Sequence, residues 1–307
     1  MIRIEHLAKS FAAPGASASG WASLLPRRGP ARRVQAVVDV DLVAPDGRIT
    51  GLLGANGAGK TTTLRMLAGL IAPDAGRVSV DGIDVAAEPR RAVARMGVLS
   101  DARGLYPRLT ARENIVYYGR LQGLTREAAN ARAEVLARMF EMRALLDRRT
   151  EGFSQGERMK TALARALVHD PANIVLDEPT NGLDVLATRA LRETLRWLRS
   201  PEGGSKCIVF STHIMQEVER LCDSVVIVSR GRSVASGSVA SLLAQTGEPD
   251  FEDAFVKLAF EGDRDRDHDG DGDGDGDGDH NSDGDGDSDA DAARGAAGPR
   301  PAEAPGA

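Results

Sequence analysis

Long apolar runs and cysteines are both scarce in this chain of 307 residues. No stretch approaches the roughly 18 consecutive apolar residues of a membrane-spanning helix, and the N-terminus lacks the apolar segment of a signal peptide. The two cysteines, Cys207 and Cys222, fall where the pattern predicts a strand and a helix end. We therefore expect neither a disulfide framework nor a cysteine-bound metal, and predict a soluble or peripheral protein of a reducing cytoplasm.

Basic residues are scarce at one end of the chain. Residues 263–307 carry 15 acidic residues and 4 arginines, a net charge of −11, whereas the whole chain has a net charge of −6. The first 262 residues therefore hold 35 basic and 30 acidic side chains, or +5. The Asp-Gly repeats contain almost no side chain that could build a core, so we predict a disordered acidic tail over 263–307. An EF-hand is not expected, because its loop ends in a glutamate and none occurs between Glu261 and Glu303.

One glycine-rich segment has the composition of a phosphate-binding loop. Residues 54–61 read GANGAGKT and match the pattern G-x-x-x-x-G-K-[ST]. A short apolar strand is predicted before this segment, at 48–53, and a helix after it, at 62–69. Glycines let backbone N–H groups curl around an anion, Lys60 would reach the β- and γ-phosphates, and the Thr61 hydroxyl would ligate Mg²⁺. The segment therefore predicts a nucleotide site.

Two carboxylates follow a second apolar strand, predicted at 173–177. Asp177 and Glu178 stand at its end, where two charges are costly unless they meet a cation or a substrate. We expect Asp177 to hold Mg²⁺, directly or through water, and Glu178 to polarise an attacking water. A solvated turn is the alternative. The phosphate loop lies 117 positions upstream (177 − 60), and its presence favours the magnesium site.

Three further residues each have two interpretations. Ser154 is either an ordinary helix N-cap or part of a helix end that faces a phosphate. His213 follows a strand predicted at 206–210, at the edge of an α/β sheet where ligands bind, but a lone histidine is often merely a surface residue. Phe11 is either a core side chain or an aromatic that stacks on a base.

The remaining periodicity predicts an α/β protein. Further strands are expected at 1–11, 34–42, 77–82, 96–99, 225–228 and 233–236, and helices after Thr110 and Ser154 and at 126–146, 186–198 and 251–260. The helices at 126–146 and 186–198 are expected to bury Ala128, Val135, Leu136, Met139, Phe140, Leu186, Ala190, Leu191, Leu195 and Leu198, with Trp197 packed beside them. The segment 12–33 is rich in Pro, Gly, Ser and Arg and is expected to be a solvated loop, with a contact to lipid headgroups or an acidic partner as the alternative.

Taken together, these residues resemble the ATP-binding subunits of ABC transporters over about residues 1–260. The corresponding family motifs are Walker A at 54–61, the signature at 154–157, Walker B at 174–178, the D-loop at 181–184 and the switch histidine at His213. The resemblance implies an α/β P-loop NTPase (ABC ATPase) core with an antiparallel β subdomain. It also implies an inserted α-helical subdomain at about 101–168, within an ATP-binding domain that spans 1–262.

The resemblance also assigns site residues. It implies ATP contacts by Phe11, Gly54, Asn56, Gly57, Gly59, Lys60, Thr61, Thr62, Ser154 and Gly156. It implies Mg²⁺ ligands at Thr61, Asp177 and Asp101, and catalytic roles for Glu178, His213 and Lys60. The chain departs from the family pattern at four positions: Asp101 replaces a glutamine, Phe153 a leucine, Gln155 a glycine and Glu157 a glutamine.

The resemblance implies an ATPase that drives a separately encoded membrane permease from the cytoplasmic face of the cell membrane. Two copies would pair as a homodimer, with each ATP between residues 54–61 of one chain and 154–156 of the other, and the permease would dock at 101–110. The sequences of segments 104–110, 153–157 and 166–171 are similar to those of ATP-binding subunits of bacterial sodium-efflux exporters. A drug or another small molecule is the alternative cargo.

Two alternatives come from other classes of protein. A soluble ABC-type ATPase acting on nucleic acid or ribosomes usually carries two ATP domains or a long coiled coil, and neither is found here, so no nucleic-acid partner is expected. A pure binding or regulatory module is disfavoured by the complete catalytic set.

Overall fold

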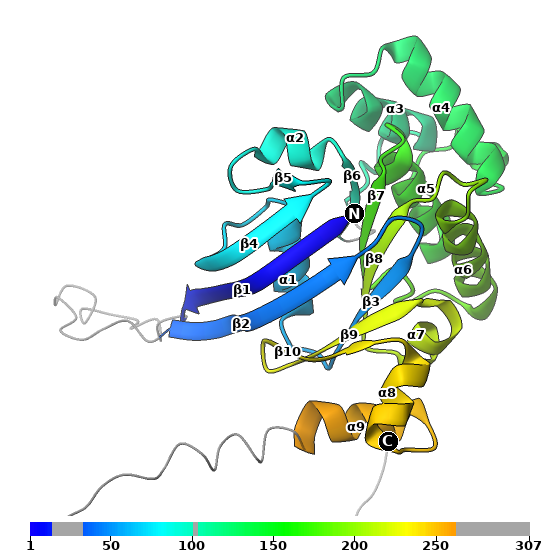
Figure 1. Ribbon diagram of the computed structural model, residues 1–307. Coiled ribbons are helices and arrows are strands. Elements are labelled where there is room, and N and C mark those ends of the chain that lie inside the picture. The colour runs from blue at the N-terminus through cyan, green and yellow to red at the C-terminus, as the bar shows by residue number, and fades with distance from the viewer. Residues whose placement is uncertain (14–32, 101–103, 262–307) are drawn as a thin grey trace, which may run out of the picture. The chain divides into compact units, whose positions relative to one another are not determined.

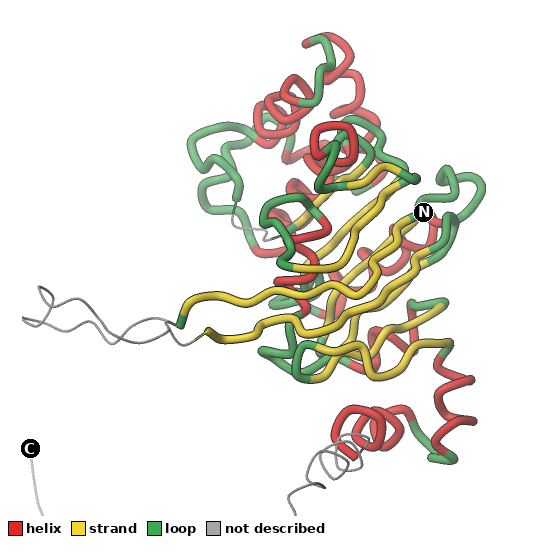
Figure 2. Tube along the Cα trace, turned by 60° about the vertical axis from the view of Figure 1, so that its left-hand side comes forward, coloured by secondary structure: helices red, strands yellow, loops and turns green. Residues whose placement is uncertain are grey.

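One mixed β-sheet organises the part of the chain that the computed structural model describes, residues 1–13, 33–100 and 104–261. Its ten strands follow the order β5-β4-β1-β2-β10-β9-β3-β8-β7-β6, and they are drawn in yellow in the tube view (Figure 2). Asp101, most of the segment 12–33 and the acidic tail lie outside the described residues.

The sheet has an antiparallel part and a parallel part. The antiparallel part consists of β1 (Ile2–Ala12), β2 (Arg33–Ala44), β4 (Ala75–Val80) and β5 (Ile83–Asp84). The parallel part consists of β3 (Ile49–Leu53), β6 (Met96–Leu99), β7 (Asn173–Asp177), β8 (Cys207–Thr212) and β9 (Ser224–Ser229). Strand β10 (Arg232–Gly237) forms a hairpin with β9 and joins β2 through the single parallel pair Arg232–Asp39.

Helices lie on the sheet and beyond its edges (Figure 1). They are α1 (Lys60–Leu67), α2 (Pro89–Val93), α3 (Ala111–Leu121), α4 (Arg126–Met139), α5 (Gln155–Leu167), α6 (Val185–Arg199), α7 (Met215–Leu221), α8 (Val239–Thr246) and α9 (Phe251–Val256), with a 3₁₀ turn at Arg143–Leu145 and a π turn at Lys257–Glu261. Helices α3 to α6 gather on the β6–β7–β8 side, whereas α8 and α9 lie at the β9–β10 hairpin. In the described residues we find no helix of the length and apolar character needed to cross a membrane.

Capping residues explain where several helices begin. Thr110 and Ser154 each form a capping box, in which the hydroxyl accepts the N–H of the third helical residue and that residue's glutamate accepts the cap N–H in return. The predicted starts of α3 and α5 are therefore confirmed. Apolar side chains of α3 to α6 then pack with β7 and β8 into one buried cluster that includes Leu163, Leu191 and Phe210.

Three sequence predictions about the helices are wrong in part. The helix predicted over 126–146 ends at Met139. Leu136 and Phe140 are buried as predicted, but Ala129, Ala133 and Ala137 make the rest of the buried face, while Val135 is exposed. Leu186 is 78% exposed, because five residues separate it from Leu191, which places it about 140° around α6 from the buried face. Trp197, which was expected to pack beside the buried face of α6, is 43% exposed at the edge of a pocket. The short elements β5, α2 and α8 were not predicted.

Candidate active site

The phosphate-loop segment turns tightly between the buried strand β3 and helix α1. Gly59 is the residue before α1 and has φ 106°, which side-chain-bearing residues rarely adopt. A Cβ at Gly59 would lie 2.6 Å from the carbonyl oxygen of Ala36 in β2. Glycine is therefore required here for two reasons, the left-handed backbone and the close approach of β2. The N-terminus of α1 is left facing the loop, as anion binding requires.

Lys60 places a buried ammonium group at the loop. Its Nζ donates to the carbonyl oxygens of Gly54 at 2.7 Å and Ala55 at 3.1 Å. The same Nζ lies 3.4 Å from Oε1 of Glu178, with only 5% of the lysine side chain exposed. These contacts hold the positive charge between the glycine-rich loop and the end of β7.

Asp177 and Thr61 bring two oxygen ligands together. The Thr61 hydroxyl donates to Oδ1 of Asp177 at 3.2 Å, which joins the first turn of α1 to the end of β7. Hydroxyl and carboxylate oxygens are hard donors of the kind that Mg²⁺ prefers. This pair therefore fits a magnesium ion.

Glu178 and His213 form the second half of the cluster. Nδ1 of His213 lies 2.7 Å from Oε2 of Glu178, at hydrogen-bonding distance. Glu178 has φ 47°, an uncommon backbone conformation for a residue with a side chain, and such conformations are concentrated at functional sites. The structure thus brings Lys60, Thr61, Asp177, Glu178 and His213 together.

Ser211 is a residue of this cluster that the sequence analysis missed. Its hydroxyl donates to Oδ1 of Asp177 at 2.6 Å and accepts the backbone N–H of Glu178 at 3.0 Å. One buried hydroxyl on β8 therefore fixes both carboxylate residues of β7. The available signal was a polar residue near the carboxyl end of an apolar strand, two positions before His213.

Ser154 lies at the exposed start of α5, and its predicted cap role is confirmed. Its hydroxyl accepts the N–H of Glu157 at 3.2 Å, and the carboxylate of Glu157 accepts the N–H of Ser154 at 2.7 Å. That N–H and the nearby Arg148 hold the pKa of the Glu157 carboxyl below its usual range, against the opposing effect of burial. Arg148 also lies over the Phe153 ring, 5.4 Å from its centroid, so two of the three departures from the signature pattern, Phe153 and Glu157, contact this arginine.

Two predicted nucleotide contacts are not joined to the cluster within this chain. Among the described residues, no hydrogen bond or ion pair connects Ser154 or Gly156 with Lys60, Asp177 or Glu178. Phe11 is 41% exposed, so it is not a core residue; Lys9 lies over its ring. Phe11 pairs with Val34 on β2, two positions before the Ala36 carbonyl that backs Gly59.

A strand, a glycine loop and a helix follow one another here, and the carboxylate strand β7 lies in the same sheet with only β8 between it and β3. This arrangement defines a P-loop NTPase core. A family model described as "ABC transporter" matches residues 37–181. The "ABC transporter ATP-binding protein NatA" of Bacillus subtilis is 45% identical over 230 residues, which cover 75% of this chain and 92% of that protein. The chain belongs to the family of ABC transporter ATP-binding subunits, and its domain is an ABC ATPase.

Other relatives and solved structures agree with this assignment. A "Nod factor export ATP-binding protein I" of Burkholderia lata is 43% identical over 64% of this chain and 64% of its own length. The "Linearmycin resistance ATP-binding protein LnrL" of Bacillus subtilis is 35% identical over 70% of this chain and 67% of its own length. A solved structure described as the ATP-binding subunit of an ABC transporter superposes with a TM-score of 0.69 at 28% identity, covering 84% of this chain and 99% of the solved one. The predicted family and fold class are therefore confirmed.

Proposed function

We propose that this chain is the ATP-hydrolysing subunit of a bacterial exporter and that it powers a separate membrane permease. The observation that carries the proposal is the cluster of Lys60, Thr61, Asp177, Glu178 and His213, which places a cation, two hard oxygen donors and a hydrogen-bonded carboxylate at one phosphate loop. The relative named for Nod factor export supports export as the direction.

ATP would lie on the glycine loop. The backbone N–H groups there and the Lys60 ammonium would bind its phosphates, using Gly54, Asn56, Gly57, Gly59, Lys60, Thr61 and Thr62. Thr61 and Asp177 would hold Mg²⁺, with Asp101 as a proposed third contact, and the ion would neutralise developing phosphate charge. Glu178 would orient the attacking water, and His213, already bonded to Glu178, would contact the γ-phosphate.

The remaining predicted contacts are expected to come from a second copy of the chain. Ser154 and Gly156 would face the phosphate loop of the partner, and Phe11 would stack on the adenine of its own chain. A related cassette with 22% identity is described as dimeric, and its fold is shared with a TM-score of 0.66. Val185 and Leu186, at the start of α6, are 79% and 78% exposed, and a homodimer interface would cover them.

Sodium is the proposed cargo, because the relative with 45% identity is the ATP-binding protein NatA and because segments of the sequence resemble those of sodium-efflux subunits. Drug or other small-molecule efflux is the alternative. The chain would act at the cytoplasmic face of the membrane, bound to its permease.

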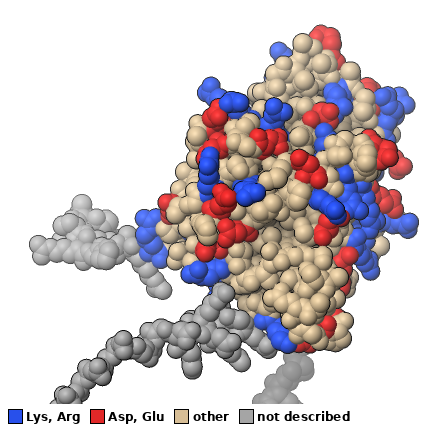
Figure 3. Space-filling model, viewed as in Figure 1, with Lys and Arg blue, Asp and Glu red and all other residues tan. Residues whose placement is uncertain are grey.

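On the face seen in Figure 3, basic and acidic side chains are interspersed, which is a pattern typical of a solvated surface.

The substitution Glu178→Gln tests the catalytic assignment. It keeps the size of the side chain but removes the negative charge, so we expect ATP turnover to be abolished while ATP-dependent dimers still form. Phosphate release measures turnover, and size-exclusion chromatography with light scattering measures the dimer. Turnover near that of the wild type would defeat the assignment of Glu178.

The permease is tested separately. Purification of the tagged chain from gently solubilised membranes should recover a multi-span membrane protein, which can then be assayed for sodium or drug efflux. Recovery of ribosomal or nucleic-acid-bound partners without a membrane protein would favour the soluble ATPase. The assignment of the ATP-hydrolysing site would then remain, but the exporter assignment would be refuted.

A further inference from the structure

Gln155 links the start of α5 to the loop that follows the carboxylate strand. Its Nε2 donates to the backbone carbonyl oxygen of Asn181 at 3.1 Å. Within residues 104–261, this is the one hydrogen bond recorded between α5 and the segment 178–199. The residue is also a departure from the family pattern, which has a glycine at this position and thus no side chain that could form such a link.

The backbone at Gly182 is shaped to admit the Gln155 side chain. Gly182 has φ 73°, and a Cβ there would lie 2.4 Å from Nε2 of Gln155. A larger residue would have to displace the glutamine and break its hydrogen bond to Asn181. The contact therefore depends on both positions, the glutamine on α5 and the glycine in the loop.

The loop carries this contact directly to Glu178. The N–H of Asn181 donates to the backbone carbonyl oxygen of Glu178 at 3.1 Å. Glu178 in turn holds its carboxylate 2.7 Å from His213 and 3.4 Å from Lys60. A continuous path thus runs from the helix end at Ser154, through one side chain and one tight turn, to the carboxylate of the candidate active site.

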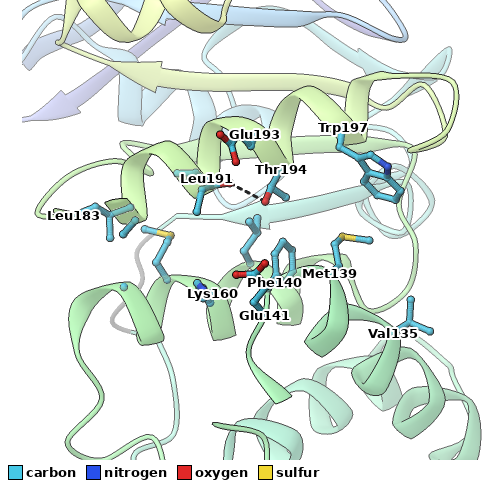
Figure 4. Close-up of a pocket in the computed structure, with 15 residues that line it drawn as sticks. Val135, Met139, Phe140, Glu141, Lys160, Leu183, Leu191, Glu193, Thr194 and Trp197 are labelled. Atoms are coloured by element: carbon cyan, nitrogen blue, oxygen red, sulfur yellow. Dashed lines mark hydrogen bonds between the residues drawn. The ribbon is translucent and has the colours of Figure 1, made fainter. Parts of the chain in front are cut away.

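A groove lies beside this path, between α5 and α6. A pocket of about 560 Å³ lies between α4, α5 and α6, and its lining includes Gly156, Met159 and Phe140. Figure 4 shows Leu183 at one end of α6 and Trp197 near the other, with the pocket between them. The Gln155 contact joins α5 to the 178–199 segment at one end of this groove, where Gly156 and Leu183 line the pocket.

We propose that Gln155 is a positioning residue that transmits the state of an ATP held against Ser154 to the carboxylate of Glu178. The inference rests on the proposed function. In the proposed homodimer, Ser154 faces the ATP bound by the partner chain, whereas Glu178 serves the ATP of its own chain. The link therefore couples the two ATP sites of the dimer, so that hydrolysis at one site responds to occupancy of the other.

Three substitutions at Gln155 separate the hydrogen bond from the bulk of the side chain. Q155A removes both, Q155E keeps the size but cannot donate to the Asn181 carbonyl, and Q155K retains a donor. Q122A is the matched control, because Gln122 is an exposed glutamine at the end of α3, in the same helical region. G182A tests the same contact from the side of the loop.

ATP turnover and nucleotide binding are measured for each variant. We expect Q155A, Q155E and G182A to lower kcat about five-fold, the factor that corresponds to one lost neutral hydrogen bond, and to lower the Hill coefficient for ATP towards 1. The Kd of a fluorescent ATP analogue should stay within about two-fold of the wild-type value, because the phosphate loop is unchanged. Q122A should behave as the wild type, Q155K should lose less kcat than Q155E because it keeps a donor, and the double variant Q155A/G182A should lose no more than either single variant.

Trp197 gives a readout that does not require hydrolysis. In a W21F background it is the one remaining tryptophan, and its emission should shift to longer wavelength in Q155A and Q155E as the groove opens. An unchanged kcat and Hill coefficient in Q155A and Q155E, or an equal loss in Q155K, would overturn the proposal. A wild-type chain that binds ATP without turnover would instead overturn the proposed function. In that case the Trp197 emission of Q155A and Q155E would still test the Gln155 link, and an unshifted emission would refute it.

Discussion

Substitution of Ser211 by alanine should damage the active site without touching a residue that faces ATP. The Ser211 side chain is fully buried on β8, and its hydroxyl holds two groups at the end of β7. Alanine removes the donor to the Asp177 carboxylate and leaves the N–H of Glu178 without its partner. The strained backbone at Glu178 then loses one of the contacts that fix it.

The expected cost follows from these two hydrogen bonds. A hydrogen bond to a charged group contributes about 1.5–3 kcal/mol, and an orphaned buried N–H costs about 1–3 kcal/mol. We therefore expect S211A to lower the free energy of unfolding by about 2.5–6 kcal/mol. Ser224 is a matched control on the next strand but one. Among the described residues its hydroxyl has one hydrogen-bond partner, the Thr50 hydroxyl at 3.1 Å, so S224A should cost about 1 kcal/mol.

Urea unfolding followed by circular dichroism measures both variants, and the slopes of the transitions show whether the unfolded states are comparable. ATP turnover of folded S211A should fall about ten-fold or more, since 1.4 kcal/mol of lost positioning at the carboxylates corresponds to a factor of ten. Equal costs for S211A and S224A, with normal turnover in S211A, would show that the Ser211 bridge does not hold the two carboxylate residues.

Two further predictions concern stability. Burial disfavours the ionised Asp223 carboxyl, but hydrogen bonds from Arg199 and a backbone N–H outweigh this effect and lower the pKa of Asp223 below the usual 3.8. The ionised carboxylate therefore stabilises the folded protein above about pH 4, and this stabilisation is lost as the pH falls through the lowered pKa. D223N should thus be less stable than the wild type in urea at pH 7, with the difference shrinking towards pH 3, and a constant difference would contradict the ion-pair account. L191A should cost about 2–5 kcal/mol in a thermal or urea melt because it opens a cavity in the core, whereas L186A, on the exposed side of α6, should stay within about 0.5 kcal/mol.

The parts of the fold that short patterns encode could be predicted from the sequence. The capping boxes at Thr110 and Ser154 gave the starts of α3 and α5, and apolar runs gave the central strands. The buried faces of the helices were harder to predict where both large and small apolar residues could pack inward. In α4, three alanines pack inward because they allow neighbouring helices to approach closely, while the larger Val135 stays exposed.

The candidate site could be predicted in its parts but not in its connections. Each of Lys60, Asp177, Glu178 and His213 follows from a local pattern beside a strand or helix end. Ser211 joins two of them only because β7 and β8 pair in a particular register, with Asp177 opposite Ser211. The Gln155 contact to Asn181 spans 26 positions and depends on a turn geometry that no local pattern specifies.

The strand order also has a consequence for how the protein is made. β3 lies between β8 and β9 in the sheet. Ile49 therefore cannot pair with Ile208 on β8 until the ribosome has synthesised the 159 residues that separate them (208 − 49). At about 5–20 residues per second, a ribosome needs about 8–30 s to deliver that strand. During this interval β3, a strand whose residues are all buried in the folded protein, emerges without its partners. Chaperone binding to the nascent chain should therefore be strongest while residues between β3 and β8 are being translated, and should fall once β9 has left the exit tunnel.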